Sequence, residues 1–166
     1  MDGLKSVKTP LNSPLEVGIR ALMLLSEAFP ARLDLNRLVL LDHGLLHSAD
    51  LGGPESLHPR LPIQAGELGI KRTTIEQGLQ VMIRAGLVEM DVSEQGIHFA
   101  ASERAYGFVN LLASEYAGGL HSRAAWIVDH FEDLSEPSLR DQMRGIFDNW
   151  SEEFEPLEVF STTDGS

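Results

Sequence analysis

The densest group of side chains that could do chemistry lies in "DHGLLHSADLGGPESLHP", residues 42–59. His43 and His47 are four residues apart, so on a helix both imidazoles would share one face and could bind one metal ion. Asp50 or His58 could supply a third ligand, which makes a metal-dependent hydrolase one hypothesis. However, the segment lacks the extended pattern of zinc proteases, and no serine in it stands in a glycine-flanked nucleophile elbow.

A structural role explains the same residues without chemistry. His47, Ser48 and Asp50 could cap the carboxyl end of a helix and hydrogen-bond the Gly-Pro loop that follows. Asp42 could then orient a basic partner such as Arg37 or Arg72. We favour this structural role, and we therefore predict no catalytic residue, no bound metal and no cofactor.

Composition indicates one globular unit inside the cell. The chain has 166 residues, of which 43% are hydrophobic and 23% charged, enough for one well-cored domain. It contains no cysteine, which excludes disulfides and thiolate metal sites and favours an intracellular protein. The N-terminus lacks the apolar region of a signal peptide, and no apolar run approaches the roughly 18 residues that span a bilayer. We expect a soluble cytoplasmic protein.

Two strongly apolar helices are predicted near the N-terminus. Ser13 can cap the first, Pro14 fits its first turn, and Pro30 closes it. Asp34 can cap the second, which contains Asp42 and His43. Their leucine-rich stripes indicate a helical hairpin that forms either a core or a subunit interface.

The next segments follow the order of a winged helix. We expect a brief helix in "QAGELGI", a turn at Gly69, and a helix in "RTTIEQGLQVMIRAG" that Thr73 or Thr74 caps. Gly86 can close that helix, and the alternation of "LVEMDV" and "GIHFAA" around "SEQG" predicts a hairpin with Gly96 in its turn. The predicted fold is mainly α with a small β-hairpin: a winged helix (helix-turn-helix plus wing) flanked by N-terminal and C-terminal helices.

Helical periodicity continues beyond the hairpin, over about residues 102–113, 115–132 and 136–150. The expected organisation is a flexible leader at 1–13, a helical winged-helix accessory domain at 14–133, an acidic C-terminal helix at 134–158 and a disordered tail at 159–166.

The charge distribution argues against autonomous DNA binding. The formal net charge is -12, and residues 129–166 hold 11 acidic and two basic side chains. The hairpin adds three acidic residues and no Lys or Arg, although DNA affinity depends on cationic side chains at phosphates. The expected recognition helix offers a modest set of DNA contacts: Lys71, Arg72, Gln77, Gln80 and Arg84. We prefer a protein-docking module, with a DNA-binding transcription regulator as the alternative.

Short stretches in a fixed order resemble one protein family: "SPLEVGIRAL", "HSAD", "GPESLHP", "GEL" and "QGLQVMIRAGLVE". Over about residues 9–131 the chain resembles the middle component of bacterial ABC-three-component systems, a group that includes the Lamassu anti-phage and anti-plasmid systems. The resemblance implies a small accessory subunit that acts with an SMC/Rad50-like ABC ATPase and a nuclease-like effector. It also implies that DNA is met only through the complex.

The resemblance carries no catalytic residue onto this chain. The positions that match its motifs are candidates for a buried polar network that shapes a docking surface: Asp42, His47, Ser48, Asp50, Ser56, His58, Glu67 and Arg72. The resulting hypothesis is a non-catalytic scaffold that bridges the ATPase and the effector. The N-terminal helices or the winged helix would dock on the ATPase, and the helical C-terminus or its acidic face would contact the effector.

Overall fold

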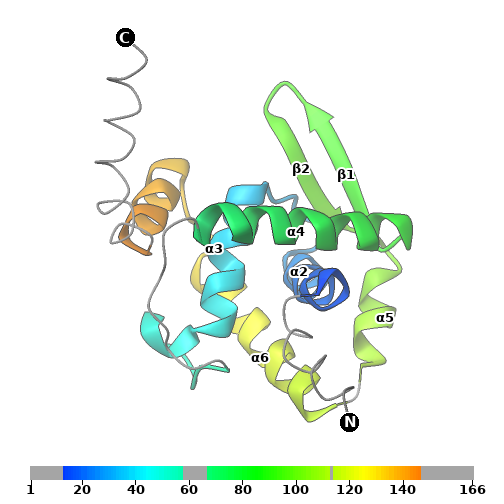
Figure 1. The fold of residues 1–166 in the computed structure, drawn as a ribbon, viewed down its shortest axis with the longest axis horizontal. Coiled ribbons are helices and arrows are strands. Elements are labelled where there is room, and N and C mark those ends of the chain that lie inside the picture. Colours follow the sequence, from blue (N-terminus) through cyan, green and yellow to red (C-terminus); the bar gives the residue numbers. More distant parts are fainter. Residues whose placement is uncertain (1–12, 58–66, 113, 147–166) are drawn as a thin grey trace.

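The computed structural model describes residues 13–57, 67–112 and 114–146, and these residues form a mainly helical body with one hairpin (Figure 1). The fold class is confirmed at that level. A further helix covers residues 136–146. The elements in chain order are α2 (Pro14–Ala28), α3 (Leu35–Leu46), the 3-10 helix η2 (Ser48–Leu51), α4 (Glu67–Arg84), β1 (Val88–Ser93), β2 (Gly96–Ala101), α5 (Ala105–Asn110) and α6 (Glu115–His130).

Helix α2 runs through the centre of the molecule. The Ser13 hydroxyl accepts a hydrogen bond from the Glu16 amide at 3.2 Å and Pro14 occupies the first turn, which confirms the predicted start. Helices α3, α4, α5 and α6 all pack against α2, and Leu22, Leu24 and Leu25 have no exposed surface. The leucine stripe of α2 was compatible with either a core or a subunit interface. In the structure this stripe forms the core of the chain.

Helix α3 joins α2 in the same core. The Asp34 carboxylate accepts from the Arg37 amide at 2.8 Å and caps the helix, as predicted. Leu38 and Leu45 are fully buried. At Gly44 an added Cβ would lie 2.5 Å from the Cδ1 atom of Ile127, so this glycine permits the close approach of α3 to α6.

Helix α4 is continuous from Glu67 to Arg84, so the predicted break into two helices is wrong. Gly69 lies inside the helix instead of forming a turn, and Thr74 is an interior residue whose hydroxyl donates to the Ile70 carbonyl at 2.7 Å. A helical glycine costs only about 1 kcal/mol, and threonine can satisfy its hydroxyl on the preceding turn, so neither residue ends a helix that packs well. Ile75, Leu79 and Met82 are buried, mainly against α2, and Ile83 is half-buried.

The hairpin follows α4 as predicted. Gly86 ends the helix with a φ of 76°, and the Leu87 amide donates to the Met82 carbonyl at 2.9 Å. Strands β1 and β2 are antiparallel, and Gly96 adopts a φ of 110° next to the two-residue turn. The hairpin projects from the helical body (Figure 1).

Residue Leu33, between α2 and α3, ties the hairpin to the helices. Its amide donates to the Phe99 carbonyl at 2.8 Å, and the Phe99 amide donates back to the Leu33 carbonyl at 2.8 Å. The base of β2 is therefore held on both sides, by β1 and by the segment that connects the first two helices.

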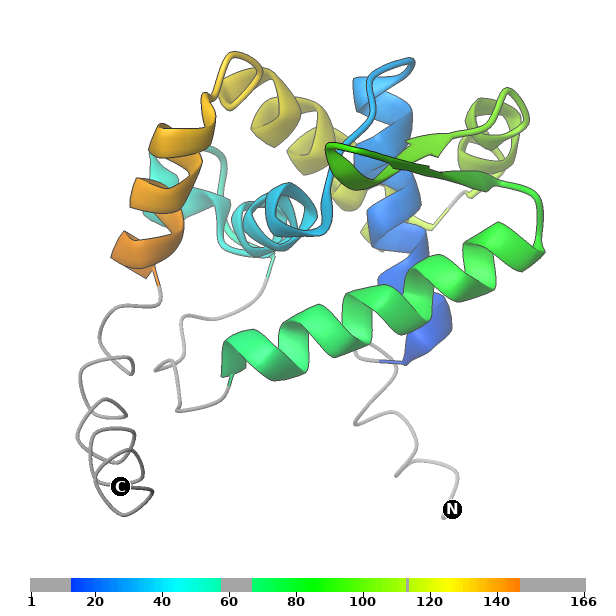
Figure 2. The same ribbon diagram turned by 90° about the horizontal axis from the view of Figure 1, so that it is seen from above.

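Helices α5 and α6 are shorter than their predicted ranges of 102–113 and 115–132. Helix α5 begins at Ala105 because the Ser102 hydroxyl donates to the Gly86 carbonyl at 2.9 Å and fixes the preceding turn. Ser114 caps α6 through the Ala117 amide at 3.0 Å. The helix at 136–146 lies at one end of the body beside α3 (Figures 1 and 2). The predicted leader up to residue 12, and the predicted helix and tail from residue 147 onward, lie outside the described residues.

Candidate functional site

A buried ion-pair cluster joins the three helices α2, α3 and α4. Arg20 donates from Nε to Asp42 Oδ1 at 2.8 Å and from Nη2 to Asp42 Oδ2 at 3.2 Å. Lys71 Nζ lies 2.9 Å from Asp42 Oδ2. Arg20 and Asp42 are each 2% exposed, so the charges meet in an environment where an unpaired charge would be costly. The cluster fixes how the three helices meet.

The cluster keeps Asp42 ionised. Burial alone would raise the pKa of the Asp42 carboxyl, but the adjacent Arg20 and Lys71 charges outweigh that effect and hold this pKa well below its ordinary value. A carboxylate bound on both oxygens by cations is unsuited to act as a general base. The arrangement is that of a structural clamp.

The predicted partners of Asp42 are wrong. Arg37 extends instead toward Glu136, with 3.3 Å between Nη2 and Oε2, and Arg72 donates to the Asn36 side chain. The reason is helical geometry: Lys71 and Arg72 are adjacent on α4 and point in different directions, so only one of them can face Asp42. Arg20, the partner that sequence reasoning missed, is the one charged residue in the apolar run "GIRALMLL", and that isolation was the available signal.

The two histidines of α3 and its C-cap do share a face. Their ring centroids are 4.9 Å apart. Burial, followed by the nearby His47 and Lys71, lowers the pKa of His43 to about 4, which leaves it neutral near pH 7. Asp50 is exposed, and His58 lies outside the described residues. Within the described ranges, no group of three or more His, Asp or Glu side chains is arranged to hold a metal ion.

The residues after His47 build a closed loop. The Ser48 hydroxyl donates to the Pro54 carbonyl at 2.8 Å, and the Ser56 hydroxyl accepts from the Ala49 amide at 3.0 Å. The interpretation of Ser48 as a residue that hydrogen-bonds the Gly-Pro loop agrees with this geometry. Asp42 thus belongs to the ion-pair cluster of the three helices, whereas Ser48 and Ser56 hold the loop and Arg72 bonds to Asn36.

Helix α6 holds the loop in place through contacts that sequence reasoning missed. The Arg123 guanidinium donates to the Glu55 carbonyl at 3.0 Å and 2.6 Å. An added Cβ at Gly53 would lie 2.6 Å from the Trp126 ring, so the indole covers the loop at a point where only glycine fits. Trp126 is half-buried and packs against the core at the border between α6 and this loop.

The hairpin presents two unlike faces. Val88 pairs with Ala101, Met90 with Phe99 and Val92 with Ile97, and residues directly opposite in antiparallel strands point to the same side. One face is thus apolar along its whole length. The other carries Glu89, Asp91 and His98.

Burial along the apolar face declines toward the tip. Val88 and Ala101 at the base are buried, whereas Met90 is 49%, Val92 67% and Ile97 50% exposed. The tip of the face therefore has no covering within the described part of the chain.

Comparison with known proteins assigns the chain to a family. The sequence model of the ABC-three component (ABC-3C) system Middle Component 2 matches residues 10–153. The chain belongs to this family. No curated protein and no solved structure matches it. Membership implies that this Middle Component 2 protein works with other components of its system.

Two of the motifs that carried the family resemblance each contain a glycine, and these two glycines lie against each other in the structure. In this Middle Component 2 chain, Gly18 of "SPLEVGIRAL" and Gly78 of "QGLQVMIRAGLVE" lie where α2 crosses α4. An added Cβ at Gly78 would lie 2.6 Å from the Gly18 nitrogen, and one at Gly18 would lie 2.7 Å from the Gly78 carbonyl oxygen. Both contacts involve backbone atoms, so the crossing distance requires glycine on both helices.

The candidate DNA contacts are divided between two sides of α4. Gln77, Gln80 and Arg84 are exposed. Lys71 is bound to Asp42 and Arg72 to Asn36. Glu67 begins the helix. The cationic side chains at the start of α4 are thus committed to contacts within the chain.

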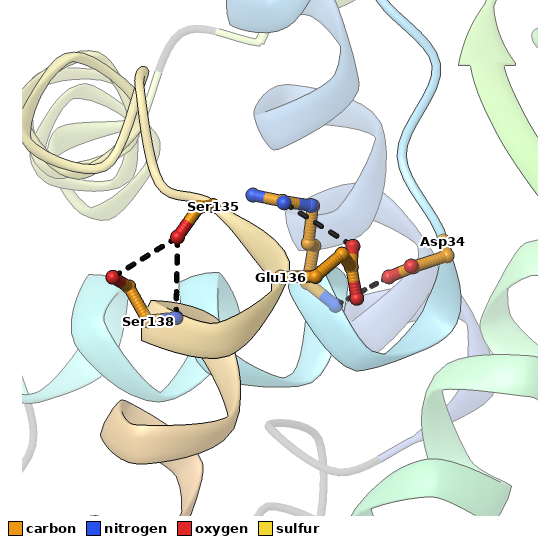
Figure 3. A network of polar contacts seen from close by, with 5 residues as sticks. Asp34, Ser135, Glu136 and Ser138 are labelled. Atoms are coloured by element: carbon orange, nitrogen blue, oxygen red, sulfur yellow. Dashed lines mark hydrogen bonds and ion pairs between the residues drawn. The ribbon is translucent and has the colours of Figure 1, made fainter.

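The helix at 136–146 is attached to α3 by a polar contact (Figure 3). Ser135 caps it, accepting from the Ser138 amide at 3.3 Å, and Glu136 pairs with Arg37 on α3. Leu139 of this helix is 1% exposed.

Among the helices that the structure describes, none is long and apolar enough to cross a membrane.

Proposed function

We propose that this Middle Component 2 protein is a non-catalytic scaffold subunit of an anti-phage and anti-plasmid defence complex of the Lamassu type. It bridges an SMC/Rad50-like ABC ATPase and a nuclease-like effector. Family membership carries the proposal, because a middle component acts with the other components of its system. The motif resemblance over residues 9–131 supports the identity of those partners.

The internal use of polar side chains supports the absence of catalysis. Asp42 is bound by Arg20 and Lys71, and the Ser48 hydroxyl is bound to the loop backbone. Catalytic groups need to reach a substrate, and buried side chains whose bonding capacity is filled by the protein do not. ATP hydrolysis and nucleic-acid cleavage would then belong to the partners.

We assign the fold to the winged-helix type. The order of α2, the bridging residue Leu33, α3, α4 and the hairpin supports this assignment, with Leu33 in place of the first strand. It differs from the predicted helix-turn-helix, because α4 as a whole takes the position of the recognition helix. Fold alone does not imply DNA binding, and the hairpin in the position of the wing is acidic.

The alternative is a DNA-binding regulator, which the exposed Gln77, Gln80 and Arg84 on α4 would serve. It predicts a dimer whose DNA affinity falls steeply with salt. The acidic hairpin and the engaged Lys71 argue against this alternative.

The test is co-expression of the three components with a tag on the ABC component. We expect the effector to be retained on the tagged component only when this chain is present, in stoichiometric amounts. Equal retention of the effector without this chain would contradict the bridging role. A chain that purifies alone as a DNA-binding dimer would favour the regulator.

A further inference from the structure

The exposed part of the hairpin carries an apolar cluster that the described residues of the chain leave largely uncovered. Met90, Val92 and Ile97 share the face whose base is buried in the core, so the cluster continues the core outward. Three neighbouring large apolar side chains, each about half exposed or more, are unfavourable in water unless another surface covers them.

The hairpin is built to present this cluster rigidly. Opposite Met90, Phe99 exchanges two hydrogen bonds with Leu33 and is 7% exposed, and at the base of the hairpin Val88 and Ala101 are buried. The Ser102 amide donates to the Leu87 carbonyl at 2.9 Å and closes the end of the pair. A surface that is already ordered loses little conformational entropy on binding.

The hairpin that carries the cluster is acidic, with Glu89 and Asp91 on its opposite face, and this charge indicates the chemistry of what covers the cluster. Residues 88–101 contain Glu89, Asp91 and Glu94 and no Lys or Arg. Asp91 pairs with Arg32, whose Nη1 atom lies 3.4 Å from an Asp91 carboxylate oxygen, and the two side chains are 45% and 62% exposed. Two copies of this hairpin would repel each other, whereas a surface with basic side chains around an apolar groove would be attracted.

We propose that the apolar face of the hairpin, at Met90, Val92 and Ile97, docks into an apolar groove edged by Lys or Arg on another protein component of the system. This inference rests on the proposed scaffold function and names the surface through which it acts. Apolar anchors with a charged rim are the usual composition of a specific interface.

The experiment uses the three components together and compares single Val92→Asp and Ile97→Asp variants with Leu111→Asp. Leu111 lies on the C-cap of α5, away from the hairpin, and is 79% exposed, so this control adds the same charge at an equally open apolar position. Thermal unfolding is measured for every variant. We expect Val92→Asp and Ile97→Asp to weaken binding to the partner by about 30-fold or more, and Leu111→Asp to leave it unchanged.

Four results would overturn the proposal. If wild type assembles and Val92→Asp and Ile97→Asp assemble equally well, the docking surface lies elsewhere although the scaffold function stands. If Leu111→Asp weakens binding as much as Val92→Asp, the effect is not specific to the hairpin. If Val92→Asp instead abolishes self-association of the isolated wild-type chain in light scattering, the occupant is a second copy. Failure of wild type to assemble would remove the scaffold function and this inference together.

The charge of the groove has its own test. A Glu89→Lys, Glu94→Lys double variant should bind the same partner about tenfold more weakly at low salt, and the difference should shrink as salt is raised. Tighter binding of this variant would mean that the groove is edged by acidic side chains and would overturn the assigned chemistry.

Discussion

Helix α2 and the hairpin both carry a continuous apolar face, but the two faces differ in how far the rest of the chain covers them. On α2 the leucines between Leu22 and Leu25 are fully covered by the chain's own helices. On the hairpin the face is covered at Val88 and left open at Val92 and Ile97. The difference separates the part of the molecule that holds the fold together from the part that is available to a partner.

The same contrast applies to charge. Asp42 is buried between Arg20 and Lys71, and its bonds serve the packing of three helices. Asp91 on the hairpin makes a single exposed contact with Arg32 at 3.4 Å. The internal carboxylate is bound on both oxygens by cations, whereas the hairpin carries an acidic excess. Four measurements can break or refine this contrast.

Removal of the buried carboxylate should have the greatest effect. Asp42→Ala removes the carboxylate that pairs with the buried Arg20 and with Lys71, so we expect the free energy of unfolding to fall by about 3–5 kcal/mol in urea titration. Asp91→Ala removes the exposed carboxylate and should cost less than about 1 kcal/mol. Equal losses would show that the two acids have the same structural importance and would remove the contrast.

The crossing of α2 and α4 should be nearly as sensitive. Gly78→Ala places a methyl group 2.6 Å from the Gly18 nitrogen, which forces the helices apart, and we expect a loss of about 1–3 kcal/mol in the free energy of unfolding. Gly69→Ala in the same helix is the matched control. Outside the backbone of α4, no atom of the described residues lies within 4 Å of the added Cβ there, so stability should be unchanged or rise by up to about 1 kcal/mol.

Acidification should act through His43. Its folded-state pKa is about 4 against an ordinary value of 6.5, so between these pH values the unfolded chain binds a proton that the folded chain excludes. The free energy of unfolding should therefore decrease as pH falls from 6.5 to 4, by less than about 1.4 kcal/mol per pH unit. Urea titrations of His43→Gln should show a shallower slope in this window. An unchanged slope would mean that His47 or an acidic neighbour carries the dependence.

The open end of the hairpin should tolerate a charge. Because Val92 is 67% exposed, Val92→Asp should change the free energy of unfolding by no more than about 0.5 kcal/mol, while the same change at Leu24 should prevent folding. Thermal unfolding followed by circular dichroism distinguishes the two. A large loss of stability for Val92→Asp would mean that its side chain belongs to the core.

Local signals in the sequence predicted much of this fold. Ser13 and Asp34 cap the two helices that they were predicted to cap, and Gly86 and Gly96 lie at the two predicted reversals of the chain. Each of these features depends on only a few adjacent residues. The break expected at Gly69 was wrong for the opposite reason. Long-range packing of α4 on α2 outweighs the weak helix preference of one glycine and two threonines.

The contacts that define the candidate sites depended on tertiary structure. Asp42 was singled out, but its partners Arg20 and Lys71 come from other helices 22 and 29 residues away, and spacing along the chain does not reveal such pairs. The alternation of the hairpin was visible in the sequence. That its face is buried at Val88 and open at Val92 follows only from how far the strands project beyond the helices.

Photo-crosslinking in the assembled complex would test the docking role of the hairpin most directly. A photoreactive amino acid is placed at position 92, with position 111 as the control, and the crosslinked products are identified by mass spectrometry. We predict that position 92 crosslinks to an apolar groove with neighbouring Lys or Arg on another component, and that position 111 does not. Crosslinks from position 111 alone, or from position 92 only to a second copy of this chain, would contradict that role.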